Sequence, residues 1–183
     1  MLPKVLSAMD QTSIDLALFV FRLGVGAVML AHGVNHVIGG GKIEGTAGWF
    51  GSMGMKAPRF QAWLASLTEI GAGIALIVGL LTPLGAGGVV GTMVVAFVIN
   101  HRGNGFFIFR PGEGWEYIMV LGLCAFPLGA IGAGRWSLDH ALDITTDLDG
   151  WTGLALSVGL GTLGALLVLV TSWRPAPAAP DTE

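Results

Sequence analysis

Five apolar stretches, each close to the length that a membrane crossing requires, are the feature of this sequence that most restricts its fold. A helix needs roughly 20 apolar residues to cross a hydrocarbon layer of about 30 Å, and its backbone amides must find their partners inside the helix. The sequence therefore predicts an all-α membrane protein. The predicted spans are residues 16–38, 60–81, 84–100, 115–133 and 151–173, of which the third is the shortest.

The composition agrees with a lipid environment. Of the 183 residues, 53% are hydrophobic and 11% are charged, whereas soluble domains carry about 25% charged residues. The net charge is −3 and no basic cluster is present, so no nucleic-acid partner is expected. The single cysteine, Cys124, excludes an intrachain disulfide and a CxxC redox centre. The expected partners are membrane lipids, lipid-soluble molecules and other proteins.

The predicted organisation has a tail at each end of a membrane domain. Residues 1–15 are expected to form an N-terminal tail, and residues 174–183, with three prolines and terminal acids, a disordered tail. Thr82 and Pro83 separate the second and third spans. Because proline lacks the N–H that a continuing helix needs, a tight antiparallel turn is expected there. A loop over residues 143–150 leads into the fifth span.

Tryptophans mark the ends of the predicted spans. Five of the six lie at or beside a span end, which is typical of the aromatic belt at a membrane surface. The sixth, Trp49, lies in the first loop together with Phe50, Lys56 and Arg59. This stretch is expected either to lie in the membrane interface or to pack on the bundle.

Small residues recur at helical spacing, as in Gly153, Ser157, Gly161 and Ala165 of the fifth span. Small side chains let helices approach closely in a lipid environment. The spacing fits either packing within the chain or contacts in a homo-oligomer.

Lysine and arginine are divided unevenly between the two sides of the predicted membrane domain. The side with the N-terminus and the second and fourth loops carries Lys4 and Arg135. The positive-inside rule therefore predicts a cytoplasmic (inner) membrane protein with the N-terminus outside and the C-terminus in the cytoplasm. The cations on the predicted cytoplasmic side are Lys42, Lys56, Arg59, Arg102, Arg110 and Arg174.

Polar side chains inside the predicted spans are the strongest functional leads, because a charge at the bilayer centre costs about 2.5–3.5 kcal/mol. At about 1.5 Å per residue, His32 lies about 9 Å and Glu69 about 13 Å from the same membrane surface. The third loop emerges at that surface as well. The sequence therefore predicts a polar pocket near one surface, to which four helices contribute. Its predicted residues are His32, His36, Glu69, Asn100, His101 and Glu116.

Arg22 belongs to the opposite half of the first span, about 15 Å along the helix from His32. It shares a helix face with His36, and on an inward-turned face it is a candidate ligand-binding residue. The alternative is that its side chain extends to the nearer membrane surface.

Three interpretations of the predicted pocket remain open. His32 and His36 have the i, i+4 spacing of a helical metal pair, but no E-x-x-H motif accompanies them, so no metal site is assigned. In the second interpretation, a histidine–glutamate hydrogen bond only satisfies two buried groups. The third is a site for a redox-active, lipophilic small molecule that exchanges protons with histidine and carboxylate.

Three segments resemble the DoxX family of small integral membrane proteins. They read R-L-G-V-G-A-V-M-L-A-H-G-V-N-H in the first span, L-T-E-I-G-A-G-I-A-L-I-V-G-L-L-T-P in the second, and G-A-G-R-W-S-L-D-H after the fourth. The resemblance implies a four-helix membrane domain over residues 16–142, to which residues 151–173 add a fifth transmembrane helix. The family often has lysine where His36 stands, so a role that needs a fixed charge there is not implied.

The resemblance also implies a link to electron transfer. On this basis we expect a subunit of a cytoplasmic-membrane redox system that binds a quinone-like molecule while a partner oxidoreductase supplies electrons. The partner is required because the chain has no CxxC pair, cluster-binding cysteine set, or flavin, haem or metal motif. A non-catalytic scaffold that assembles partner proteins is the alternative, and a transporter is a weaker one. The expected catalytic residues are His32 and Glu69, and the expected ligand-binding residues are Arg22, His36, Asn100, His101 and Glu116.

Overall fold

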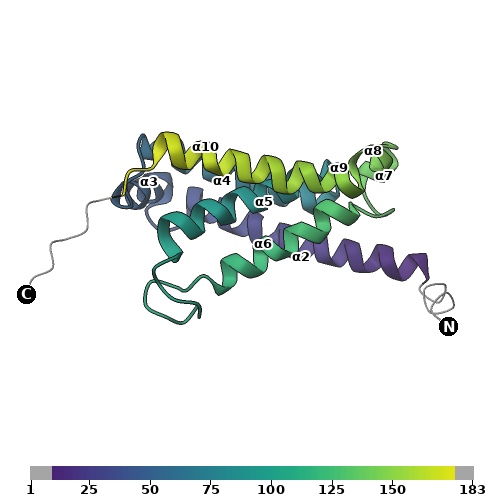
Figure 1. Cartoon of the computed structure of the whole chain (residues 1–183), viewed down its shortest axis with the longest axis horizontal. Helices are drawn as coiled ribbons and strands as arrows, with labels where there is room; N and C mark the ends of the chain where they lie inside the picture. Colours follow the sequence, from purple (N-terminus) through teal and green to yellow (C-terminus); the bar gives the residue numbers. More distant parts are fainter. Residues whose placement is uncertain (1–9, 176–183) are drawn as a thin grey trace, which may run out of the picture.

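The structure, a computed structural model, describes residues 10–175 as a bundle of helices that run side by side (Figure 1). Within these residues the extended structure is limited to one isolated β-bridge between Met55 and Trp173. Four of the described helices are long and apolar enough to cross a membrane. The predicted all-α membrane bundle with a further C-terminal helix is confirmed.

The bundle consists of five helices that alternate in direction (Figure 1). π-Helical segments, η1 and η2, form the last turn of the third helix and part of the fifth. The helices are α2 (Gln11–Ile38), α4 (Pro58–Val78), α5 (Thr82–Ala96) with η1 (Phe97–His101), α6 (Glu116–Ile131), and α9 (Gly150–Leu154) continued by η2 (Ala155–Leu160) and α10 (Gly161–Ser172).

Several helix boundaries differ from the predicted spans, most of all the start of α2 and the end of the third span. α2 begins at Gln11, earlier than the expected start at residue 16, because the Asp10 side chain accepts a hydrogen bond from the Thr12 N–H and caps the helix. The third span is not the shortest, since η1 extends it to 20 residues. The shortest is α6, with 16 residues.

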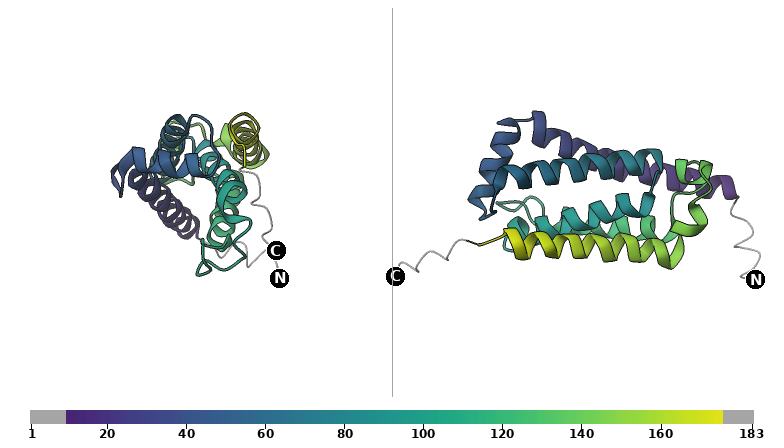
Figure 2. Two further views of the ribbon diagram at one scale, coloured as in Figure 1. Left: turned by 90° about the vertical axis from the view of Figure 1, so that its left-hand side faces the viewer. Right: turned by 90° about the horizontal axis from the view of Figure 1, so that it is seen from above.

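The segments between the helices are also more ordered than expected. The first loop contains α3 (Lys42–Ser52), which lies across one end of the bundle (Figure 2). The Thr46 hydroxyl donates to the His36 carbonyl, 2.9 Å away, so this helix packs on the bundle. Between α6 and α9 lie α7 (Leu138–Ala141) and α8 (Thr145–Leu148), the second inside the predicted loop of residues 143–150. Most of the predicted C-terminal tail lies outside the described residues.

The turn between α4 and α5 is tight, as Thr82 and Pro83 predicted. Gly79 and Leu81 both adopt left-handed backbone conformations, with φ of 67° and 48°. Pro83 then lies in the first turn of α5, where its missing N–H is not needed.

Glycines bring the helices into close contact. A Cβ at Gly26 of α2 would lie 2.8 Å from the carbonyl oxygen of Gly73 in α4. Similarly, a Cβ at Gly161 of α10 would lie 2.5 Å from the carbonyl oxygen of Gly87 in α5. Gly161 therefore serves packing within the chain and is not free to contact a partner protein.

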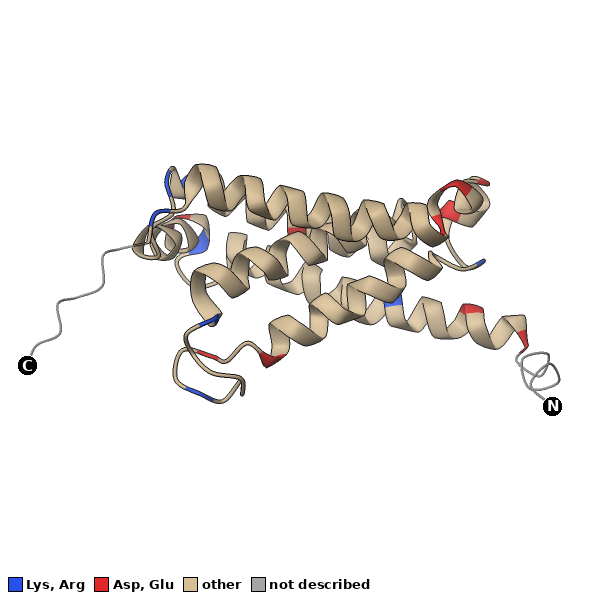
Figure 3. Ribbon diagram, in the orientation of Figure 1, with Lys and Arg blue, Asp and Glu red and all other residues tan. Residues whose placement is uncertain are grey.

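The two ends of the bundle carry different charges (Figure 3). Most lysines and arginines lie at the end with α3, which we call the α3 end. Acidic residues gather at the opposite end, with α7 and α8, which we call the α7 end. The predicted residues of the polar pocket belong to the α3 half of the bundle.

Candidate functional site

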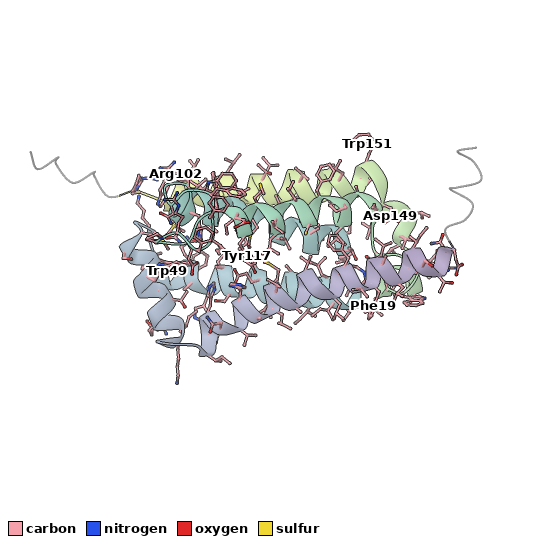
Figure 4. All side chains as sticks on the ribbon, turned by 90° about the horizontal axis from the view of Figure 1, so that it is seen from below. Phe19, Trp49, Arg102, Tyr117, Asp149 and Trp151 are labelled. Atoms are coloured by element: carbon pink, nitrogen blue, oxygen red, sulfur yellow. The ribbon has the colours of Figure 1, made fainter. Side chains whose placement is uncertain are left out.

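A cavity of about 740 Å³ extends along the bundle, from Leu84 near the start of α5 to His101 at the end of η1, and its ionisable residues lie in the α3 half. Its wall includes residues of α2, α3, α4, α5, α6 and the fifth helix. Ligand pockets in proteins commonly have volumes of about 300–1,000 Å³. In Figure 4, Trp49 and Tyr117, which line the cavity, lie in the α3 half, whereas Asp149 and Trp151 lie at the α7 end.

Glu69 and His36 form the most buried polar pair of the cavity. Glu69 is 5% exposed, and its Oε2 lies 3.2 Å from Nδ1 of His36. The two atoms are close but lack hydrogen-bond geometry, and neither has another partner in the described part of the chain. Gly33 makes this proximity possible, because a Cβ there would lie 2.9 Å from Cβ of Glu69. A buried carboxylate oxygen and a buried ring nitrogen are therefore left without hydrogen bonds.

His32 and Tyr117 form a second pair in the cavity wall. The Tyr117 hydroxyl lies 3.2 Å from Nε2 of His32, and the two ring centroids are 5.8 Å apart. Tyr117 is the only tyrosine of the chain and was not among the predicted site residues, because tyrosine is common at the ends of membrane spans and does not by itself indicate a site there. Its position in the first turn of α6 was the available signal.

Asn100 and His101 line the cavity from η1. Nδ1 of His101 lies 2.8 Å from the Glu113 carbonyl oxygen, and Nε2 lies 3.2 Å from the amide nitrogen of Asn100. Because a carbonyl oxygen only accepts, Nδ1 carries the hydrogen and Nε2 accepts from Asn100. Both ring nitrogens of His101 therefore have partners, unlike Nδ1 of His36.

Glu116 does not line the cavity, contrary to the prediction. Its Oε2 accepts a hydrogen bond of 3.3 Å from the backbone N–H of Ile108, in the loop before α6. Consecutive helical residues point about 100° apart, so Tyr117 faces the cavity and Glu116 faces the loop.

Arg22, a predicted ligand-binding residue, also lies away from the cavity. Its side chain is fully buried and donates to the carbonyl oxygens of Leu76 at 2.8 Å and Trp136 at 2.6 Å. The last carbonyl groups of a helix have no partners within the helix. Arg22 supplies a side-chain donor to the Leu76 carbonyl, which also accepts from the Gly79 N–H at 3.3 Å. The Arg22 side chain does not reach the surface of the bundle.

Two buried aspartates near the α7 end were not predicted. Asp139 accepts hydrogen bonds from the N–H groups of Leu81 and Thr82, at 2.6 and 3.0 Å, and thereby caps α5. Asp15 accepts from the Arg135 side chain at 2.6 Å. Both lie just outside the predicted spans, so the count of polar groups inside the membrane omitted them. Both hold segments of the chain together.

Five of the seven predicted site residues meet at the cavity: His32, His36, Glu69, Asn100 and His101. Within residues 10–175, no group of three or more histidine, cysteine or acidic side chains is arranged to hold a metal ion. The histidines, the carboxyl group and the phenol provide donors and acceptors for an organic ligand.

Part of the chain matches a known protein family. The model of the DoxX family matches residues 17–102, which extend from α2 to the end of η1 and contain all five of these cavity residues. No curated protein matches the chain, and no solved structure matches it. α6 and the fifth helix lie outside the matched segment. Residues 17–102, slightly less than half of the chain, therefore match the DoxX domain, and over them the predicted resemblance to this family of small integral membrane proteins is confirmed.

Proposed function

We propose that the chain is a subunit of a cytoplasmic-membrane redox system, which binds a quinone-like molecule in its cavity and works with a partner oxidoreductase. The observation that carries this proposal is the pair of unsatisfied atoms in the cavity wall, Glu69 Oε2 and His36 Nδ1. Leaving a buried polar group without a partner costs about 1–3 kcal/mol. A ligand that bonded to both would remove that cost, which favours a polar group bound at this point.

The rest of the cavity wall suits a flat ring with polar substituents. Met29, Trp49 and Phe50 supply apolar and aromatic surface. The Tyr117 hydroxyl and the His32 ring offer a second polar contact, contributed by α6 and α2. Two polar contacts in an otherwise apolar pocket fix the orientation of a small ligand.

A bound quinone supplies an acceptor for two electrons and two protons. The chain's own residues hold and move protons: His32 with the Tyr117 hydroxyl on one side, and His36 with the Glu69 carboxyl on the other. Cys124 is the only cysteine, and a single cysteine forms neither a dithiol couple nor a cluster site. The partner protein therefore supplies the electrons. With the C-terminus in the cytoplasm, the α3 end and its cavity face the cytoplasmic side.

The test is a binding titration of the whole protein in lipid nanodiscs free of quinone. A benzoquinone without a tail is added, and its binding is followed by quenching of tryptophan fluorescence, because Trp49 lines the cavity. Glu69→Leu replaces the carboxyl group with an apolar side chain of similar size. This change should weaken binding about tenfold. Glu44→Leu is the matched control, since the Glu44 side chain is 65% exposed on α3. Trp49→Phe should reduce the quenching, which would assign the signal to the cavity. Non-saturable quenching that is equal in the wild type and Glu69→Leu contradicts the proposal.

A further inference from the structure

We infer that the fifth helix forms one wall of a lateral groove that holds the isoprenoid chain of the ligand. The inference rests on the proposed function and narrows the ligand to a long-tailed membrane quinone. It also gives a role to a helix that lies outside the DoxX domain.

The cavity is much longer than a single ring. Along the third span its wall extends from Leu84 to Asn100, which corresponds to about 24 Å at 1.5 Å per residue. The hydrocarbon layer of a membrane is about 30 Å thick. The polar groups Glu69, His36 and His101 belong to the α3 half, so most of this length has an apolar wall.

Three helices form the apolar part of the groove. α5 lies between α4 and α10 (Figure 2), and it contributes Gly87, Gly88 and Gly91 to the cavity wall. Because glycine has no side chain, both neighbours pack close to α5: a Cβ at Gly88 would lie 2.9 Å from Cβ of Ala72 in α4, and one at Gly91 would lie 3.1 Å from the Gly161 carbonyl oxygen. The backbone of α5 therefore forms the floor of the groove. The side walls are formed by Leu64, Ala65 and Thr68 of α4, and by Leu156, Leu160, Gly164 and Val168 of the fifth helix.

A buried polar group at the end of the groove points to a ligand rather than to loose packing. Glu69 follows Thr68 in the same cavity wall. Its carboxyl group is more than nine-tenths buried and its Oε2 has no hydrogen-bond partner. A site with a polar end and a long apolar groove is complementary to a molecule with a polar ring and a long hydrocarbon chain.

The position of Gly164 allows a test that leaves the helix packing intact. A Cβ at Gly164 has no atom within 4 Å, and Gly164 lines the cavity. A leucine there would occupy the groove without disturbing the neighbouring helices. Gly159 is the matched control on the same helix, because its Cβ would also meet open space but it does not line the cavity.

The experiment measures the Kd, as a mole fraction in the bilayer, of two quinones that share one ring. One has no tail and the other has a long isoprenoid tail, and both are followed by tryptophan quenching in nanodiscs. Gly164→Leu should raise the Kd of the long-tailed quinone about tenfold and leave the Kd of the tail-free quinone unchanged. Gly159→Leu should change neither of the two Kd values.

Each remaining outcome overturns the inference. An unchanged Kd of the long-tailed quinone in Gly164→Leu contradicts it, and so does an equal loss of both ligands. If Gly164→Leu releases a co-purifying phospholipid while the Kd for the long-tailed quinone stays the same, the groove binds a lipid acyl chain instead. Failure of the tail-free ring to bind the wild type is a separate result, which contradicts the proposed function itself.

Discussion

Arg22 and Asp139 bind opposite sides of the turn between α4 and α5. Arg22 donates to the Leu76 carbonyl at the end of α4, and Asp139 accepts from the N–H groups that begin α5. The C-terminus of a helix carries partial negative charge and the N-terminus partial positive charge. Each side chain therefore has the sign that its helix end favours, and together they fix the hairpin.

Replacing Arg22 should lower stability without changing ligand affinity. Arg22→Met removes the side-chain donor to the carbonyl oxygens of Leu76 and Trp136, of which Leu76 keeps the Gly79 N–H at 3.3 Å. The loss should reduce the free energy of unfolding by about 2 kcal/mol. Denaturant unfolding in mixed micelles measures this. Arg59→Met is the control, because Arg59 is exposed and its surface ion pair with Glu44 contributes about 0–1 kcal/mol. Unchanged stability together with weaker quinone binding would contradict this account and would show that Arg22 contributes to ligand binding.

Asp149, just before the fifth helix, should make stability depend on pH. Burial raises the pKa of its carboxyl group, and the charge of Asp139 raises it further. A folded-state pKa above the unfolded value means that the folded state holds the proton more tightly. The stabilisation is therefore complete at low pH and is lost as pH rises through the folded pKa.

Asp149→Asn should accordingly unfold at a higher temperature than the wild type at pH 7. The difference should close as the pH falls toward about 3.9, the ordinary pKa of aspartate. Thermal scans at several pH values measure it. Asp147→Asn, at an exposed position of α8, controls for the change in net charge. A constant difference at all pH values would show that the Asp149 charge is not its cause.

The helix bundle and much of the cavity were predictable, because lipid imposes simple rules on the sequence. Span length fixes the number of helices, and counting residues from the span ends places His32, His36 and Glu69 at one depth. The actual start of α2 depends on a local hydrogen bond to Asp10, which hydropathy does not report.

The remaining site geometry depends on side-chain directions and contacts between distant segments. Glu116 and Tyr117 are adjacent in the sequence, but only the helix rotation decides which one faces the cavity. Arg22 satisfies carbonyl groups of α4 and of the segment after α6, and such a partner is visible only in three dimensions. The length of the groove likewise depends on how α4, α5 and α10 pack.

Removing the hydroxyl of Tyr117 should weaken ligand binding more than stability. Tyr117→Phe keeps the ring and loses the contact with Nε2 of His32, so the Kd for the tail-free quinone should rise about fivefold, within the range of one hydrogen bond. The thermal midpoint should change little, because this contact is exposed to the cavity. His32→Gln should have a similar effect, and His140→Gln, at an exposed position of α7, should have none. An unchanged Kd in Tyr117→Phe would show that the Tyr117 hydroxyl does not contact the ligand.

The end of the fifth helix should hold the connection between α3 and α4 in place. The indole N–H of Trp173 donates to the Met53 carbonyl at 2.9 Å, and the Lys56 N–H donates to the Ser172 carbonyl at 2.7 Å. Trp173→Phe removes the first bond and keeps an aromatic ring near Arg102. Hydrogen–deuterium exchange at residues 53–56 should then become about threefold faster or more.

Trp151→Phe is the matched control for this exchange experiment. Trp151 is 86% exposed at the opposite end of the bundle, so its replacement should leave exchange at residues 53–56 unchanged. Equal exchange in Trp173→Phe and the wild type would mean that other contacts hold this segment.

The most direct test of the polar cavity is the amount of quinone that co-purifies with the protein from its native membrane. Lipids extracted from the purified wild type, Glu69→Leu and Glu44→Leu proteins are assayed for quinone per mole of protein. Because Oε2 of Glu69 has no hydrogen bond, we expect bound quinone in the wild type and Glu44→Leu proteins, and much less in Glu69→Leu. Equal amounts in all three proteins, or no quinone in any of them, would contradict the account.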